Sequence, residues 1–117
     1  TVHSSHNTLA YTKIGRVVHV QGEVRFSAIS SPSGNMSLSL PFAVADLAEG
    51  AARFMSAPIG QSGFNGTPNQ TYYGSVKGEG VDTMFISTHN SGSDTGVNAN
   101  QVTTNTEMIF SFTMIAA

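Results

Sequence analysis

The 117-residue sequence contains no cysteine, and only 10% of its residues are charged. The absence of cysteine excludes disulfide bonds and metal sites built on thiolates. Soluble domains usually contain about 25% charged residues, so we expect serine, threonine, asparagine, glutamine and glycine to cover most of this surface. Such a surface is common in extracellular β-proteins and suits glycans, which are neutral polar ligands. An all-β structural protein without a glycan ligand would have the same composition.

Clusters of basic residues and long apolar runs are also missing. The formal net charge is −2, and the five lysines and arginines are spread along the chain. This argues against nucleic-acid binding, because phosphate contacts need clustered cations. No apolar run approaches the roughly 20 residues of a transmembrane helix. The N-terminus lacks the basic-then-apolar pattern of a signal peptide.

Motifs of the common enzyme classes do not occur in the sequence. There is no Gly-x-Ser-x-Gly elbow, and the glycine-rich segments do not precede a helical pattern as a phosphate loop would. Glycosidases need two carboxyl groups roughly 5 to 10 Å apart, and Glu79 and Asp82 are neighbours in sequence. Glu79, however, lies between two glycines, where a carboxylate is usually just solvated. We therefore expect no catalytic residue, no enzymatic activity and no cofactor.

A period of two residues dominates what the sequence does contain. Between residues 18 and 26, apolar side chains alternate with polar ones, which predicts a strand with one face in a core. Gly22 falls on the apolar face, where it allows a bulge or a close neighbour. We expect one long strand over residues 11–29, which bends or crosses from one sheet to another.

Further strand patterns follow along the chain. They cover residues 36–40, 51–59, 71–76, 81–88 and 107–116, and most are separated by glycine-rich turns. Residues 89–101 form a polar stretch that we expect to be a long loop. No helical stripe exceeds ten residues. The pattern predicts an all-β sandwich or barrel.

Four segments carry a resemblance to a known family. Residues 11–22, Tyr-Thr-Lys-Ile-Gly-Arg-Val-Val-His-Val-Gln-Gly, resemble the opening of a C-terminal domain of bacteriophage tail fibres and tailspikes. Residues 30–34, Ser-Ser-Pro-Ser-Gly, resemble the turn after its first strand, and residues 38–42 resemble its Leu-Pro-Phe segment. Residues 110–116 resemble its closing strand, while residues 60–101 match nothing comparable.

The resemblance implies a jelly-roll-like β-sandwich of about eight antiparallel strands, assembled as a homotrimer at the distal end of a fibre on the virion. Residues 1–8 would be a linker or connection to an upstream fibre or spike domain, and residues 9–117 the sandwich. The implied function is non-catalytic binding of host cell-surface polysaccharide or lipopolysaccharide. Two alternatives stay open: a trimerisation domain without a ligand, and a carbohydrate-binding module of a secreted enzyme.

Some strand residues are apolar on the face that should be exposed. Ile109 and Ile115 lie opposite the phenylalanines of the last strand, and Val17 lies opposite Val18. A strand that is apolar on both faces is either central in a monomer or touches a partner subunit. Together with the resemblance, this leads us to expect Val17, Ile109 and Ile115 at a trimer interface.

Tyr72 and Tyr73 are the main candidates for ligand contact. Sugar rings present C–H faces that stack on aromatic side chains, and strand alternation turns one of the two tyrosines outward. Polar partners are available in the flanking segments: Asn69, Gln70, His89, Asn90 and Asp94. The alternative is that both tyrosines pack in the core or between subunits, with their hydroxyl groups satisfied locally.

His3 and His6 form the one spacing typical of metal ligands. Three copies of a His-x-x-His pair around a trimer axis would supply six nitrogens. This spacing is common by chance, and we expect no metal.

Overall fold

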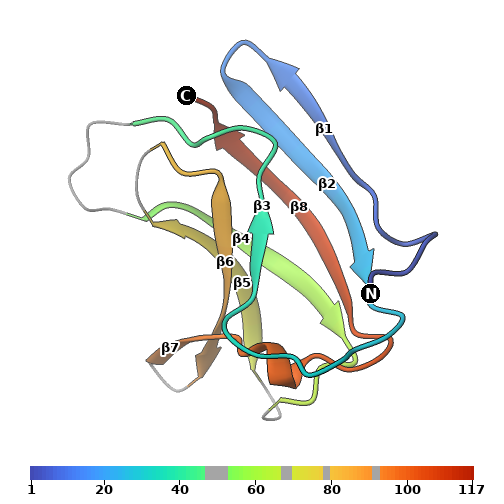
Figure 1. Ribbon diagram of the computed structural model, residues 1–117. Coiled ribbons are helices and arrows are strands. Elements are labelled where there is room, and N and C mark those ends of the chain that lie inside the picture. The colour runs from blue at the N-terminus through green and yellow to red at the C-terminus, as the bar shows by residue number, and fades with distance from the viewer. Residues whose placement is uncertain (47–52, 67–69, 78–79, 91–92) are drawn as a thin grey trace.

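The computed structural model describes residues 1–46, 53–66, 70–77, 80–90 and 93–117, and in this part the chain is almost entirely β-structure (Figure 1). One short 3-10 helix, η1, covers Ala99–Gln101. The strands are β1 Leu9–Ile14, β2 Val17–Arg25, β3 Ser37–Ser39, β4 Arg53–Ser62, β5 Thr71–Lys77, β6 Thr83–Asn90, β7 Ser93–Gly96 and β8 Glu107–Ile115. A helix with the length and hydropathy to span a bilayer does not occur among the described residues. The prediction of an all-β fold is confirmed.

The strands form one curled antiparallel sheet, a half-barrel. The hydrogen-bonded order is β1-β2-β8-β4-β5-β6-β3, and β7 also pairs with β6. β4 joins the two halves, because Ala57 pairs with Gly74 of β5 whereas Ile59 pairs with Phe110 of β8. We expected the first strand to bend or to cross from one sheet to another, but the strand that pairs with both halves is β4.

The single long strand expected over residues 11–29 is in fact a hairpin. β1 and β2 pair from Leu9↔Gly22 to Ile14↔Val17, so Gly15 and Arg16 form the two-residue turn. Gly15 has a φ of 60°, and a glycine at the first turn position suits the tight turns that match strand twist. The regular alternation begins only at residue 18, so the stretch before it gave no sign of which face was buried, and the Gly15-Arg16 pair was the local signal of the turn.

The close neighbour expected at Gly22 is present. A Cβ at this position would meet the carbonyl oxygen of Thr8 and lie 2.8 Å from the Cα of Leu9. Gly22 also has a φ of 153°, which side chains rarely adopt. Glycine therefore lets the start of β1 lie directly against β2.

The stretch expected to be a plain loop, residues 89–101, contains ordered elements. β7 pairs with β6 from Ser87↔Gly96 to Asn90↔Ser93. η1 follows, and the side chain of Asn98 caps it by accepting a hydrogen bond of 3.2 Å from the Asn100 backbone N–H. The polar composition reflects short strands and caps, in which side chains bond to the backbone.

The core lies on the concave side of the sheet. β8 alternates strictly, with Met108, Phe110, Phe112 and Met114 buried, as the sequence predicted. They pack in one cluster with side chains from β2, β4, β5 and β6, from connecting segments and from the C-terminal segment: Val18, Val20, Leu40, Val44, Ala57, Ile59, Tyr72, Val76, Met84, Ile86, Val97 and Ala116. Full burial of a large apolar side chain contributes about 1.5–3 kcal/mol, so this cluster is the main source of stability.

Residues 1–8 lie along the end of β2. The backbone N–H of His3 donates to the Arg25 carbonyl at 2.7 Å, and the Arg25 N–H donates to the His6 carbonyl at 2.8 Å. Val2 also forms a β-bridge with Phe26. The segment is therefore held against the sheet, and its role as a connection to an upstream domain stays a prediction.

Candidate functional site

The outer face of β1, β2 and β8 exposes aliphatic side chains. Ile14 is 77% exposed, Val17 46% and Ile109 51%. Ile14 pairs with Val17, and Val17 pairs with Ile115, so these three residues are neighbours at the hairpin end of the sheet. Ile109 lies near the other end of β8. Exposed aliphatic groups in a patch are typical of contact surfaces.

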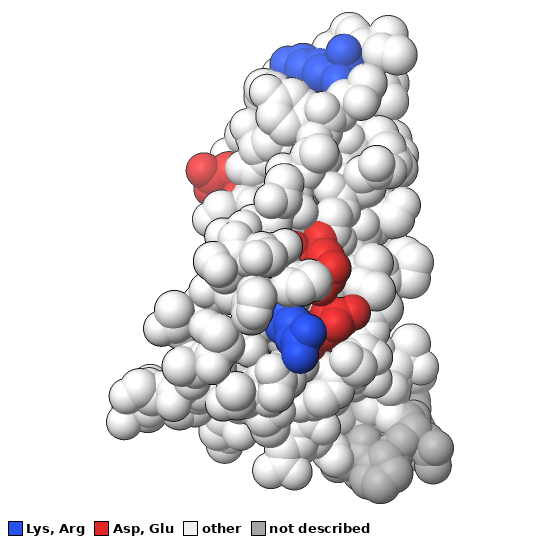
Figure 2. Space-filling model, turned by 90° about the vertical axis from the view of Figure 1, so that its right-hand side faces the viewer, with Lys and Arg blue, Asp and Glu red and all other residues white. Residues whose placement is uncertain are grey.

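Polar groups separate the two aliphatic ends of this face. His19 pairs with Thr113, and its Nδ1 lies 3.1 Å from the threonine Oγ1. Charged groups are few on the side of the molecule shown in Figure 2: red and blue atoms meet below the centre, a further blue patch lies at the top, and uncharged atoms cover most of the rest. The low charge content of the sequence therefore appears as a largely neutral surface on this side.

The structure separates the two candidate tyrosines. Tyr72 is 4% exposed, and its ring stacks on Phe64 with centroids 4.6 Å apart. Its hydroxyl donates to Gln70 Oε1 at 3.5 Å, and burial raises its pKa above the ordinary value of 10.0. Local packing thus occupies the ring of Tyr72, which a sugar on the surface cannot reach in this conformation.

Tyr73 faces the other way and is half-buried on the outer side of the sheet. It pairs with Ser87, and Phe85 lies two residues from Ser87 on the same face, so the two aromatic side chains are diagonal neighbours. Phe85 is 44% exposed. Sequence reasoning missed Phe85, although the inward direction of Met84 and Ile86 would have placed it outside.

The polar candidates around the tyrosines have different positions. His89 is exposed and pairs with Thr71, at the Tyr73 end of this aromatic face. Gln70 lies against Tyr72 instead. Asn69 lies outside the described residues. Asn90 and Asp94 have their backbones in β6 and β7, and their side chains are outside the described set.

His3 and His6 lie close together, with ring centroids 4.9 Å apart. The Nδ1 of His3 accepts a hydrogen bond from the Ser5 backbone N–H, and the Nδ1 of His6 lies 2.9 Å from Glu23 Oε1. Within the described part of the chain, no three potential metal ligands come together. In this single chain the His6 contact with Glu23 helps to hold residues 1–8 against β2, whereas the side-chain hydrogen bond of His3 is local.

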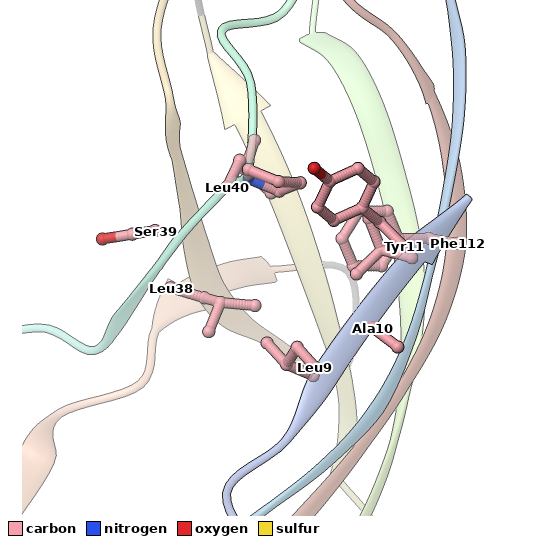
Figure 3. A pocket seen from close by; sticks show the side chains of 9 residues that line it. Leu9, Ala10, Tyr11, Leu38, Ser39, Leu40 and Phe112 are labelled. Atoms are coloured by element: carbon pink, nitrogen blue, oxygen red, sulfur yellow. The ribbon is translucent and has the colours of Figure 1, made fainter. Parts of the chain in front are cut away.

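A groove runs along the open seam of the half-barrel, where β1 faces β3. A hollow of about 230 Å³ has a mostly apolar lining: Leu9, Ala10, Tyr11, Val20, Leu38, Ser39, Leu40, Pro41 and Phe112. Figure 3 shows Leu9 and Leu38 pointing toward one another across the gap, whereas Ser39 points away.

A second hollow of about 640 Å³ continues the first, because Leu9 and Leu38 line both. The other side chains around it are Val2, Asn7, Val24, Phe26, Met36, Ser37, Ile86, Met108 and Phe110. We call the two hollows together the seam groove. Its floor is part of the buried core.

A lysine lies beside one end of the seam groove. The Nζ of Lys13 is 4.1 Å from the centroid of the Phe42 ring, and Phe42 meets Tyr11 edge to face at 5.2 Å. Lys13 pairs with Val18, a core residue, so it points to the concave side of the sheet. Among the described residues, no carboxylate forms an ion pair with it.

No family model matches this sequence, and comparisons with curated proteins and with solved structures find no similar protein. The residues and their arrangement are therefore what points to a function.

Proposed function

We propose that this chain is a non-catalytic domain that assembles as a homotrimer at the distal end of a phage tail fibre or tailspike and binds host-surface polysaccharide. The observation that supports it most is the exposed aliphatic set on the outer face of β1, β2 and β8. A monomer gains nothing by exposing Ile14 and Ile109 to water, whereas their burial between subunits is favourable.

The curled sheet would be a jelly-roll-like β-sandwich, and its outer face would contact the other two subunits of the trimer. Val17, Ile109 and Ile115 would lie in the contact. The segmental resemblance to fibre and spike domains supports this arrangement, with residues 1–8 leading to an upstream domain. The surface then left exposed is poor in charge, as recognition of a neutral glycan requires.

The aromatic face of β5 and β6 is the proposed glycan surface. Tyr73 and Phe85 offer adjacent ring surfaces, and His89 adds a polar group at one end. Single stacking contacts with sugars are weak. Three copies on one rigid tip would raise the effective affinity through avidity.

The first test of assembly is the mass in solution, measured by light scattering after size exclusion. We expect three times the 12.3 kDa of one chain. Ile109→Asp should yield folded monomer, because a carboxylate would be buried without a partner in the interface. Ser39→Asp, an exposed position on β3, is the control and should stay trimeric. A wild-type monomer would contradict the trimer.

The first test of recognition is a titration with purified host surface polysaccharide. Tyr73→Ala and Phe85→Ala should each weaken binding about tenfold, while Thr71→Ala, at the edge of the same face, should not. A trimer that binds none of the polysaccharides would favour the second candidate, an assembly domain without a ligand. A monomer with Tyr73-dependent binding would favour a carbohydrate-binding module.

A further inference from the structure

We infer that the seam groove is a binding site for a single-chain anionic amphiphile, with its hydrocarbon tail between β1 and β3 and its head group at Lys13. This is independent of the proposed trimer and of the outer aromatic face.

The groove has the size and the lining of a small-molecule site. Binding pockets for small ligands usually span about 300–1,000 Å³ and are mainly apolar with a few polar groups. The larger hollow measures about 640 Å³, and Asn7 and Ser37 are the polar residues in its lining. Ile86, Met108 and Phe110 form its floor, so an apolar tail would touch core side chains directly.

The two walls can separate at little cost in hydrogen bonds. β1 and β3 are the two ends of the strand order, and no backbone pairing between them occurs among the described residues. Side chains alone span the seam, with Leu9 and Leu38 on opposite walls (Figure 3). A tail can therefore enter by moving side chains, without breaking the sheet.

Charge favours an anionic head. Lys13 is held beside the groove by the ring of Phe42, and no carboxylate among the described residues neutralises it. The ring of Tyr11 contacts Phe42, Tyr11 also lines the hollow, and its side chain adds a hydroxyl group. A carboxylate, sulfate or phosphate on a hydrocarbon tail would complete this arrangement.

A protein strand is the less favourable occupant. A strand added to β1 would place its own side chains beside Lys13 on the concave face, and inward-pointing charges on edge strands oppose such pairing. A second copy of the chain also has the exposed aliphatic side chains on the outer face of β1, β2 and β8 available to it.

Methyl NMR on the intact protein tests this inference, with methionine methyl groups labelled with carbon-13 and dodecanoate added below its critical micelle concentration. Met36 and Met108 line the groove, whereas Met84 and Met114 are core residues outside its lining. We expect saturable shifts at Met36 and Met108 and much smaller ones at the other two. Shifts spread evenly over these four of the chain's five methionines, or no saturable shift, would overturn the site.

Matched ligands and variants sharpen the result. Decanoate should bind about tenfold more weakly than dodecanoate, because two fewer CH₂ groups are buried. Dodecyltrimethylammonium should bind more weakly than dodecanoate in the wild type, and Lys13→Gln should reduce that preference by about two- to fivefold. Equal affinity for both head groups in the wild type would refute the role of Lys13.

A blocking variant addresses the tail. Leu38→Trp should abolish the Met36 and Met108 shifts by filling the groove, whereas Ser39→Trp, which points away on the same strand, should leave them unchanged. If Leu38→Trp binds dodecanoate as the wild type does, the tail lies elsewhere. The wild-type methyl map decides the question even if this variant does not fold.

Discussion

The two halves of the curled sheet are built on different principles. β1, β2 and β8 are regular, with nine consecutive pairs between β2 and β8 and strict alternation of buried and exposed residues along β8. In the half made of β4, β5 and β6, the register shifts between Arg53 and Met55, and Ser75 and Ser87 are buried on the outer side. The first half therefore combines an uninterrupted β2–β8 ladder with a fully apolar core face on β8, whereas the second contains a register shift and buried polar side chains.

The largest effect should come from Phe110→Ala in the regular half. Phe110 is 1% exposed, and its removal should lower the free energy of unfolding by about 3–5 kcal/mol through lost burial and a cavity. Phe85→Ala in the other half should cost below about 1 kcal/mol, because that ring is 44% exposed. Urea denaturation measures both. Similar losses of unfolding free energy for the two variants would contradict this difference between the two halves.

The next effect should come from Gly22→Ala, at about 3 kcal/mol. The new methyl group would run into the backbone of Thr8 and Leu9, and the alanine would need a φ of 153°. Because backbone atoms cannot move aside without loss of the β1–β2 pairing, amide exchange in β1 should also accelerate. Gly15→Ala is a control for positive φ, since it has no neighbour within 4 Å.

Gly74→Ala should be milder, at about 1–2 kcal/mol, although the close contact looks equally severe. Here the new methyl group would meet the side chain of Met84. Methionine has three rotatable bonds and can repack. Thermal unfolding of both glycine variants compares a rigid neighbour with a flexible one. A loss for Gly74→Ala equal to that for Gly22→Ala would show that Met84 cannot yield.

The smallest effect concerns pH. Burial raises the pKa of Tyr72, so the folded state favours the neutral hydroxyl. This contribution to stability is fully present below the unfolded-state pKa of about 10 and is lost as the pH rises through the folded-state value. We expect the melting temperature of Tyr72→Phe to fall less steeply between pH 9 and about 11 than that of the wild type. An unchanged slope would contradict it.

The sequence predicted the regular half of the sheet best. The alternation from Met108 to Met114 identified β8 and its buried face, because one face meets the core and the other does not. The β1–β2 hairpin was missed because the regular alternation begins only at residue 18, and the Gly15-Arg16 pair, a two-residue turn signal, was not used. The crossing at β4 depends on which partners flank each of its ends, and this is tertiary information that no local pattern contains.

The candidate sites likewise include features that the sequence predicted and features that it could not show. Strand alternation correctly predicted that one of the two adjacent tyrosines points inward. Applied to β6, it would also have placed Phe85 on the outer face. It could not show that Tyr72 stacks on Phe64, since these residues lie on different segments. The seam groove was invisible in the sequence, because its walls come from β1 and β3, the two ends of the strand order.

The place of β8 in the sheet has a consequence for biosynthesis. It is the last strand along the described chain, yet it lies between β2 and β4. While the ribosome is still adding the preceding residues, both of those strands keep an open edge, and such edges promote aggregation. A nascent chain that stalls before Glu107 would therefore contain nearly all the strands but could not join β2 to β4 in one sheet. We expect such a truncated chain to be insoluble.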